Sequence, residues 1–502
     1  MRSSAFVFHG QIAALSLDPC GQTISPQFDS RIILSMTTET KTNVHQLPSI
    51  ARLGWPSTDA ARSGFGRQVL YALQIAANSL IGYLFSRLLA YHFGISELMS
   101  GFEIAFSVPF IILNISGFTF LHAIISSLFA RMLANKSVRL DQVFSSVLNL
   151  MWLAGGSLML LGFGFSGVLT ELLAPGLSLA AKQYTETLVL WMLPLVLTLG
   201  TGTYFGAIFT AYQIPLTMEF TLLVSRLGFV ALALTVLPEF TLIQASIGLL
   251  SFSVGALAIK WMILSRATGL KYKATLRFNL PEVNVVGRQA AVFFFVAAMA
   301  VLASSYIRRL ATFDGPGTVA ALSYGVSVVS PLGILLGKTF SFATAARYIA
   351  LYERKEYASA LKLIFRYTAL SLGICGILVL LMNSWIYELI SVLYGGGRFG
   401  IESVRETANI THTVLWSLPG IAISWVVMVP LMNRTTSHAG AVIYATCYLM
   451  QILLNYFLFP SLKRQMLIWS ITLCASLQAA VGVGYIVFSL SKAMKTVAHD
   501  EV

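Results

Sequence analysis

Long apolar blocks follow one another along the chain from about residue 68 to residue 490, and short polar segments separate them. A helix needs about 20 mainly apolar residues to cross a bilayer. The pattern therefore predicts twelve membrane-spanning helices, several of them long enough to require tilting or kinking. Their expected ranges are 68–91, 99–131, 141–168, 182–211, 215–237, 241–265, 287–310, 317–345, 358–387, 402–432, 438–460 and 467–490. The expected kink positions, where proline removes a helix hydrogen bond, are Pro109, Pro194, Pro331 and Pro419.

Similar segments recur in the two halves of the chain. The pairs are VLWMLP (189–194) with VLWSLP (414–419), ELLAPG (171–176) with ELISVLYGGG (388–397), and PFIILNISGFTF (109–120) with PLGILLGKTF (331–340). All three pairs keep the same order at a displacement of roughly 217–225 residues, which indicates two homologous six-helix halves. Halves that enter a membrane in the same direction are related by a pseudo-two-fold axis along its normal, and the cavity between them is the usual transport path.

We therefore expect an all-α polytopic membrane protein with two homologous six-helix lobes around a central cavity. The expected parts are a polar, disordered N-terminal tail (1–65), a first lobe with helices one to six (66–265), a basic cytoplasmic linker (266–286), a second lobe with helices seven to twelve (287–490) and a cytoplasmic tail (491–502). A chain start at Met36 is the alternative to a long tail, and it leaves translation of residues 1–35 open.

Composition supports this class of protein. Hydrophobic residues make up 57% of the 502 residues and charged residues 11%, whereas soluble domains have about 25% charged residues. A net charge of +13 would suggest nucleic-acid binding in a soluble protein. Here the Lys and Arg residues gather in short loops, which favours their retention in the cytoplasm, and we expect no nucleic-acid partner.

The basic segments also predict the orientation. Lys and Arg gather at 131–141, 266–288 and 346–357, which fall on one side of the membrane under the twelve-helix count. The opposite segments 168–181 and 238–241 have no Lys or Arg. The positive-inside rule then places both termini in the cytoplasm.

Motifs of catalysis and metal binding are missing from the sequence. It has no HExxH, no GxSxG, and no Cys/His cluster with metal-ligand spacing. The glycine-rich stretch LYGGGRFG (393–400) lacks the Gly-Lys-Ser/Thr ending of a phosphate-binding loop. We expect it to form a turn in which glycine supplies positive φ angles. We thus expect no catalytic residue and no cofactor, other than a coupling ion or the membrane potential.

Polar side chains inside the predicted spans are the candidate functional residues, because a charge in a bilayer is costly unless it faces a cavity, a partner or the interface. Spans one, two, seven and eight carry Arg87, Glu103, Asn114, Arg308, Arg309, Ser327 and Lys338. If these spans line the central cavity, the cations would hold the pyrophosphate of a lipid-linked substrate. The alternative is that the three arginines are interfacial anchors at helix ends.

Two further features concern the first lobe. Glu219 and Arg226 lie two turns apart on one face of the fifth span, either as a structural intramembrane pair or as part of a coupling path. Lys260 lies near the cytoplasmic end of the sixth span, where we expect its amine to reach water by snorkelling.

Three stretches resemble the MurJ/MviN family of lipid-linked glycan flippases, within the superfamily that includes Wzx-type and MATE transporters. They are FGISELMSGFEIAFSVP (93–109), APGLSLAAKQYTETLVLWMLP with AIFTAYQIP after it (174–194 and 207–215), and LYGGGRFGIESVRETANITHTVLWSLPG (393–420). The resemblance covers about residues 68–460 and implies a divergent member of the family.

The chain departs from the family at positions that the resemblance associates with lipid II. Family members carry arginines in spans one, two and eight, and this chain has Ser79 and Phe85, Leu113 and Asn114, and Ser327 near those positions. Ser100 stands near the family's acidic residue. Arg87, Arg308, Arg309 and Lys338 would supply positive charge from neighbouring positions. Lipid II as the substrate therefore stays open.

The resemblance implies a flippase in the bacterial cytoplasmic membrane that moves a polyprenyl-pyrophosphate-linked saccharide, either lipid II-like or an exopolysaccharide precursor, by alternating access. Membrane lipids and glycan-synthesis enzymes would be its other partners. Two alternatives remain at this stage: a cation-coupled, MATE-like small-molecule exporter, and a transport-inactive scaffold of a glycan-synthesis complex.

Overall fold

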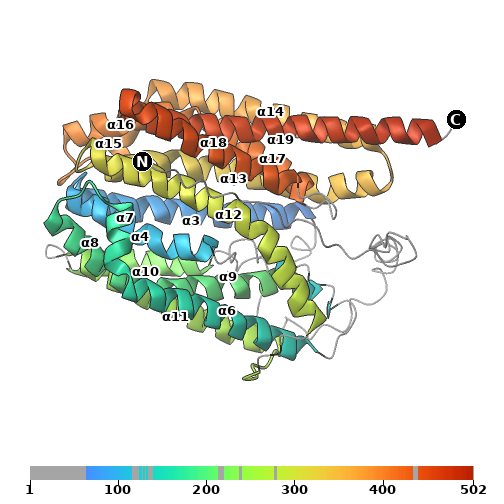
Figure 1. The fold of residues 1–502 in the computed structure, drawn as a ribbon, viewed down its shortest axis with the longest axis horizontal. Helices are drawn as coiled ribbons and strands as arrows, with labels where there is room; N and C mark the ends of the chain where they lie inside the picture. Colours follow the sequence, from blue (N-terminus) through green and yellow to red (C-terminus); the bar gives the residue numbers. More distant parts are fainter. Residues whose placement is uncertain are drawn as a thin grey trace, which may run out of the picture. The chain divides into compact units, whose positions relative to one another are not determined.

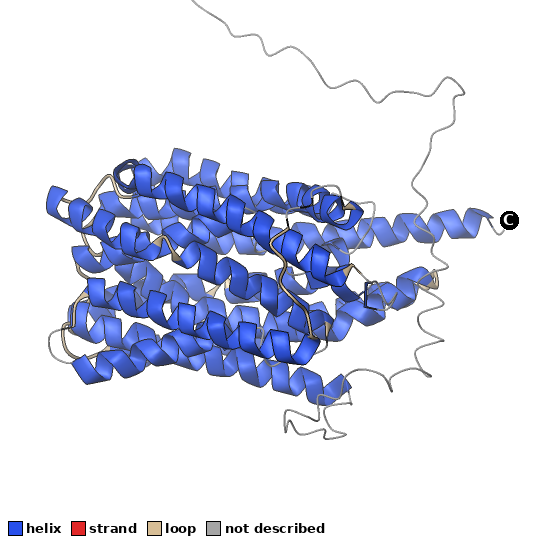
Figure 2. Ribbon diagram, turned by 90° about the horizontal axis from the view of Figure 1, so that it is seen from below, coloured by secondary structure: helices blue, strands red, loops and turns tan. Residues whose placement is uncertain are grey.

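The computed structural model describes residues 64–115, 124–126, 128–130, 132–133, 139–212, 220–236, 240–275, 277, 280–432 and 439–500. Helices joined by short turns make up nearly all of these ranges, and no strand occurs in them (Figure 2). The predicted N-terminal tail lies outside the described residues, except that Gly64 and Phe65 already belong to the first helix.

The helices run roughly side by side in Figure 1. Those of the N-terminal half are α3 (Gly64–Phe93), α4 (Glu97–Ile115), α6 (Leu140–Gly164), α7 (Ser166–Leu173), α8 (Leu179–Met192), α9 (Leu195–Ala211), α10 (Phe220–Val236) and α11 (Leu242–Thr268). Those of the C-terminal half are α12 (Pro281–Asp314), α13 (Thr318–Glu353), α14 (Tyr357–Ser384), α15 (Ile386–Tyr394), α16 (Ile401–Leu415), α17 (Leu418–Met432), α18 (Ala439–Leu462) and α19 (Arg464–Asp500).

Nine of the helical segments in the described ranges are long and apolar enough to cross a membrane, and the bent pair α16–α17 makes a tenth. These ten coincide with predicted spans two to four and six to twelve. Helices α3 and α10 occupy the first and fifth predicted spans, and α10 has only 17 residues. The chain is thus an all-helical, multi-pass membrane protein, as its apolar blocks predict.

The sequence repeat has a counterpart in the helix breaks. Phe165 separates α6 from α7 with φ −117° and ψ 21°, and Trp385 separates α14 from α15 with φ −125° and ψ 18°. The next break in each half follows the repeated VLW motif. Pro194 is the N-cap of α9, and α16 bends by 44° into α17, whose second residue is Pro419. The same breaks in the same order support a common ancestry of the two halves.

The two halves meet closely at one end of the bundle, which we call the closed end and define as residues 91–100, 172–178, 312–320 and 392–400. Backbone packs against backbone there. A Cβ atom on Gly317 would lie 2.2 Å from the Ile95 carbonyl oxygen, and one on Gly176 would lie 2.3 Å from the Thr312 carbonyl oxygen. These approaches are possible because glycine has no side chain.

Hydrogen bonds between the halves reinforce the closed end. The amide of Arg398 donates to the Tyr91 carbonyl over 2.9 Å. The Ser100 hydroxyl donates to the Pro316 carbonyl over 2.8 Å and accepts from the Ala320 amide over 3.3 Å. Ser100, which stands near the family's acidic residue, therefore holds the second half against the first.

The glycine-rich stretch after α15 is a turn, as predicted. Gly396 and Gly397 have φ angles of 121° and 55°, which favour glycine. Gly396 and Phe399 exchange two backbone hydrogen bonds across the turn. The Phe399 ring is buried and packs against Tyr324 and Tyr394, so the turn is anchored in the bundle.

Gly317→Ala tests whether close backbone contact holds the closed end. The added methyl group must push against the Ile95 carbonyl, and forcing a group into a packed site costs about 1–3 kcal/mol. We expect a lower midpoint of thermal unfolding for the purified protein. Gly373→Ala is the matched control, because its Cβ would meet nothing within 4 Å. Equal midpoints for the two variants would contradict the account.

Candidate functional site

A charged cluster lies where the two halves touch inside the bundle. Helix α4 packs against α12 and α13, which brings Glu103 of α4 near Arg308 of α12 and Ser323 of α13. Glu103 and Arg308 are both partly buried. Glu103 belongs to the N-terminal half and Arg308 to the C-terminal half. The attraction between the two charges therefore acts across the interface between the halves.

Aromatic hydroxyls adjoin this cluster. The Ser327 and Tyr394 hydroxyls are hydrogen-bonded over 2.9 Å, and the Tyr324 and Tyr394 rings lie 5.1 Å apart. Tyr83 of α3 donates its hydroxyl to the Val328 carbonyl over 3.1 Å. The rings of Tyr324 and Tyr394 lie near enough to Glu103 to feel its charge. Helices α3, α4, α12, α13 and α15 thus all contribute to one polar region.

Tyr324 has a property that fits a binding site. Its side chain is 2% exposed, and its hydroxyl has no hydrogen-bond partner in the part of the chain that the structure describes. A buried hydroxyl without a partner is costly. Such a group near Glu103 would gain a partner from a polar ligand once the halves separate and expose it.

Two predicted site residues, Arg87 and Arg309, lie outside this cluster. Arg87 of α3 donates to the Val392 carbonyl of α15 over 2.9 Å. Arg309 of α12 donates to the Leu172 carbonyl of α7 over 3.2 Å. In each pair the first helix of one half reaches the last turn of the short helix in the other half. We call these two contacts the arginine clasps.

The clasps follow the internal repeat. Helix α7 corresponds to α15 in the repeat, and α3 corresponds to α12 as the first helix of its half. One clasp joins α3 to α15, and the other joins α12 to α7. A cation at the last carbonyls of a helix is favourable because those groups lack partners and carry the negative end of the helix dipole. In this structure the clasps therefore belong to the closed end.

Asn114 and Lys338 lie away from the cluster. The Asn114 amide donates to the Phe110 carbonyl of its own helix, and the Lys338 amine lies 5.4 Å from the centre of the Trp425 ring. At 1.5 Å per residue, Asn114 is roughly 16 Å along α4 from Glu103. Lys338 lies 15 residues after Ser323 on α13, or roughly 22 Å along the helix. The seven predicted residues therefore do not form a single site in this structure.

The other two sequence-based interpretations have different outcomes. Glu219 lies outside the described residues. Its proposed partner Arg226 donates to the Asn78 carbonyl and side-chain oxygen over 3.2 Å, next to Gly82 of α3. The snorkelling expected of Lys260 is wrong: the residue is 1% exposed, and its amine donates to the Gly202 carbonyl. Burial among α9 and α11 removes the amine from water.

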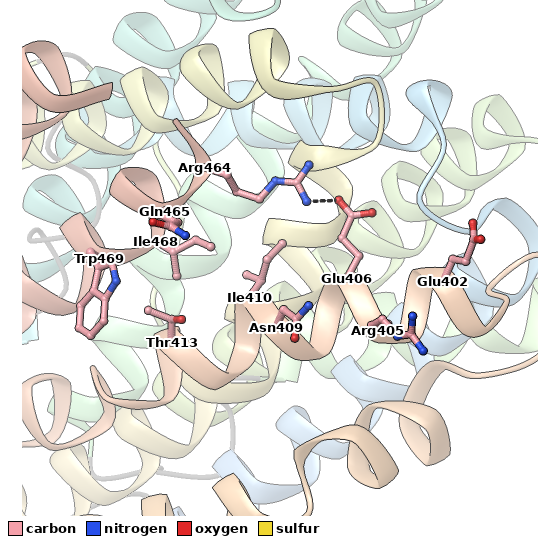
Figure 3. Close-up of a pocket in the computed structure, with 10 residues that line it drawn as sticks. All are labelled: Glu402, Arg405, Glu406, Asn409, Ile410, Thr413, Arg464, Gln465, Ile468 and Trp469. Carbon is pink, nitrogen blue, oxygen red and sulfur yellow. Dashed lines mark hydrogen bonds and ion pairs between the residues drawn. The ribbon is translucent and has the colours of Figure 1, made fainter. Parts of the chain in front are cut away.

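The structure also contains an ion-pair network that the sequence interpretation missed. Arg464, the first residue of α19, pairs with Asp314 at the end of α12 and with Glu406 of α16, and it also donates to the Thr318 hydroxyl. The signal was available in the span 401–415, where charged and amide residues recur every three or four positions. Figure 3 shows the Arg464 side chain directed at Glu406.

Metal binding finds no support in the described ranges, which contain no group of three or more His, Cys, Asp or Glu side chains that could hold an ion. The arrangement suits a different task. A paired charge and an available hydroxyl between two similar halves can accept a charged headgroup when the halves move apart.

The same fold occurs in several solved structures. The structure matches "Lipid II flippase MurJ, inward closed conformation" with a TM-score of 0.66 and 19% identity, over 84% of this chain and 87% of that chain. It also matches an inward-facing MATE family multidrug transporter, with a TM-score of 0.72 and 13% identity over 86% and 99% of the two chains.

A third solved structure has the same fold. It is a transporter of the same superfamily from Pyrococcus furiosus, described as having a binding pocket of reverse polarity. It matches with a TM-score of 0.66 and 13% identity over 87% of this chain and 98% of that one. A search of curated protein sequences finds no match.

The family model described as "Lipid II flippase MurJ" matches residues 89–500. That range includes the charged cluster, both halves of the repeat and the arginine clasps except Arg87. The chain therefore belongs to the MurJ family of lipid II flippases.

Proposed function

We propose that this protein moves a polyprenyl-pyrophosphate-linked saccharide from the inner to the outer leaflet of a bacterial cytoplasmic membrane. The observation that carries the proposal is the packing of α4 against α12, which places Arg308 of one half near Glu103 of the other among apolar helices. Arginine is suited to pyrophosphate because its forked donors match phosphate oxygens. Glu103 balances that charge when no substrate is bound.

The orientation follows from charge. The basic segment 266–288 includes the first residues of α12, whereas the closed end includes its last residues. By the positive-inside rule, the basic segment lies in the cytoplasm and the closed end faces outward. Both chain termini then lie in the cytoplasm. In this state the closed end separates the charged cluster from the outer leaflet.

Transport then requires the closed end to open. The arginine clasps and the Ser100 contacts would break, and the halves would separate at their outer ends while contacts form at the inner ends. One elementary charge that crosses a potential of 100 mV gains about 2.3 kcal/mol. The membrane potential or a coupling ion could supply this energy.

The substrate within this class is a separate question. Ser327 stands near a sequence position at which family members carry an arginine, and its hydroxyl is hydrogen-bonded to the Tyr394 hydroxyl. Leu113 and Asn114 stand near two more such arginines. An exopolysaccharide or related envelope-glycan precursor therefore fits at least as well as lipid II. Growth of cells depleted of their own lipid II flippase, with this gene supplied, decides: rescue contradicts a purely exopolysaccharide role.

The Arg308 contact also bears on the exporter alternative. A cation-coupled exporter needs a carboxylate that is available to its cargo or its coupling ion. Glu103 lies near Arg308 and Ser323, so its charge is offset by a cation that an anionic headgroup can attract. This arrangement favours the flippase over the exporter.

Arg308→Gln and Glu103→Gln test the charged cluster. Removing one partner of a buried pair leaves the other charge uncompensated, and Arg308→Gln also removes the phosphate-binding group. We expect transport of a fluorescent polyprenyl-pyrophosphate saccharide in proteoliposomes to fall at least about tenfold. Arg366→Gln is the control, because Arg366 is exposed on α14. Rates within twofold of wild type for well-folded variants would contradict the role of the charged cluster, and no transport by the wild type would favour the scaffold.

Arg87→Ala combined with Arg309→Ala tests the clasps. Spin labels on Leu179 and Ile401, which are 73% and 71% exposed at the closed end of opposite halves, report the separation there. We expect the distance distribution to shift to longer values or to broaden when both clasps are removed. Arg366→Ala should leave it unchanged. An unchanged distribution in the double variant would show that the clasps do not hold this end shut.

A further inference from the structure

A polar groove lies within the C-terminal half, separate from the charged cluster between the halves. Helices α16 and α19 line a cavity of about 660 Å³, which is within the range of small-molecule sites. Figure 3 shows the side chains of both helices directed toward this space. The lining residues are Glu402, Arg405, Glu406, Asn409, Ile410, Thr413, Arg464, Gln465, Ile468 and Trp469.

The polar residues of α16 form a continuous stripe. Glu402, Arg405, Asn409 and Thr413 are three or four residues apart, so they lie on one face of the helix. From Glu402 to Thr413 the stripe extends roughly 16 Å along α16. Polar residues inside a membrane-spanning segment are costly and usually functional.

Most of these side chains are available to a ligand. Arg464 is committed to Asp314 and Glu406. By contrast, the side chains of Arg405, Asn409 and Gln465 form no hydrogen bond or ion pair with any described residue. The groove therefore offers a guanidinium and two amides, which together donate and accept hydrogen bonds.

The internal repeat shows that the fold does not need this stripe. The VLWMLP (189–194) and VLWSLP (414–419) motifs align the two halves at a displacement of 225 residues. At that displacement, Arg405, Glu406, Asn409 and Thr413 correspond to Ala180, Ala181, Tyr184 and Leu188. Ala181 and Leu188 are buried in the apolar core. The same helix position is thus apolar in one half and polar in the other.

The charges of the groove discriminate between ligand classes. The groove is lined by two arginines, Arg405 and Arg464, and two carboxylates, Glu402 and Glu406. Arg464 is also paired with Asp314, so the groove has no excess of positive charge to favour phosphate. Trp469 is 47% exposed beside the amides, and a tryptophan presents an apolar face together with an N–H donor. Amides, hydroxyl groups and a flat apolar face suit the hydroxyls and ring faces of an uncharged sugar.

We propose that the groove between α16 and α19 binds the saccharide portion of the lipid-linked substrate, while the charged cluster binds its pyrophosphate. This inference rests on the proposed function. Because the groove adjoins the closed end through Asp314 and Thr318, it would hold the sugar on the outer side of the membrane. The site therefore assigns headgroup selection to the C-terminal half.

The test is isothermal titration of the full chain in nanodiscs with N,N′-diacetylchitobiose, inorganic pyrophosphate or choline. We expect the disaccharide to bind, and pyrophosphate and choline to give no groove-dependent signal. Asn409→Ala with Trp469→Ala should weaken disaccharide binding about tenfold or more. Thr413→Val, which keeps the side-chain shape, should weaken it in a protein with unchanged thermal stability. Trp416→Ala is the matched control, because Trp416 has the same 47% exposure outside the groove.

Several results would overturn the inference. They are no disaccharide binding, binding that the groove variants do not change, and groove-dependent binding of pyrophosphate or choline instead. Transport of a fluorescent lipid-linked saccharide by the wild type is measured in parallel. If the protein transports but shows no groove-dependent sugar binding, the sugar site is refuted and the flippase function is still supported. If sugar binding depends on the groove but the protein does not transport, the flippase function is refuted and the sugar site is still supported.

Discussion

The close approach of the two halves at the closed end is the contact on which the rest of the account depends. Gly317 and Gly176 let one backbone lie directly against another, and this approach brings Arg87 and Arg309 within reach of the helix ends of the opposite half. It also holds α4 beside α12, so that Glu103 faces Arg308. A membrane interior offers no water to satisfy separated backbone groups. These contacts therefore cannot be loosened gradually, and the halves must exchange one packed arrangement for another.

The helices themselves could be predicted because the bilayer imposes a simple rule. A segment must be apolar over about 20 residues and must satisfy its own hydrogen bonds as a helix, so hydropathy alone locates α4, α13 and α18. Proline predicted the interruptions near Pro194 and Pro419, because it removes a helix hydrogen bond. The ends of the spans were less predictable. Helix α12 begins at Pro281, six residues before the predicted span, and Leu280 and Val283 pack on the N-terminal half.

The site was predicted only in part, because sequence reports which residues are polar and not which way they point. Arg308 and Arg309 are neighbours on α12, yet consecutive helix residues lie about 100° apart around the axis. Arg308 consequently faces Glu103, whereas Arg309 reaches Leu172. Lys260 shows the same limit. Its position near a helix end suggested an amine in water, but packing of α9 against α11 gives it the Gly202 carbonyl instead. The Arg464 network joins three helices that are distant in sequence, so the polar spacing within 401–415 could indicate a polar helix face but not its partners.

The central claim is that the halves separate at the closed end during each transport cycle. A disulfide between Tyr91→Cys and Arg398→Cys tests this claim most directly, since the Arg398 amide bonds to the Tyr91 carbonyl and both side chains are exposed. The measurement is transport of a fluorescent polyprenyl-pyrophosphate saccharide in proteoliposomes before oxidation, after oxidation and after reduction. The account predicts that transport stops when the disulfide forms and returns when it is reduced. Continued transport with the disulfide intact would contradict it.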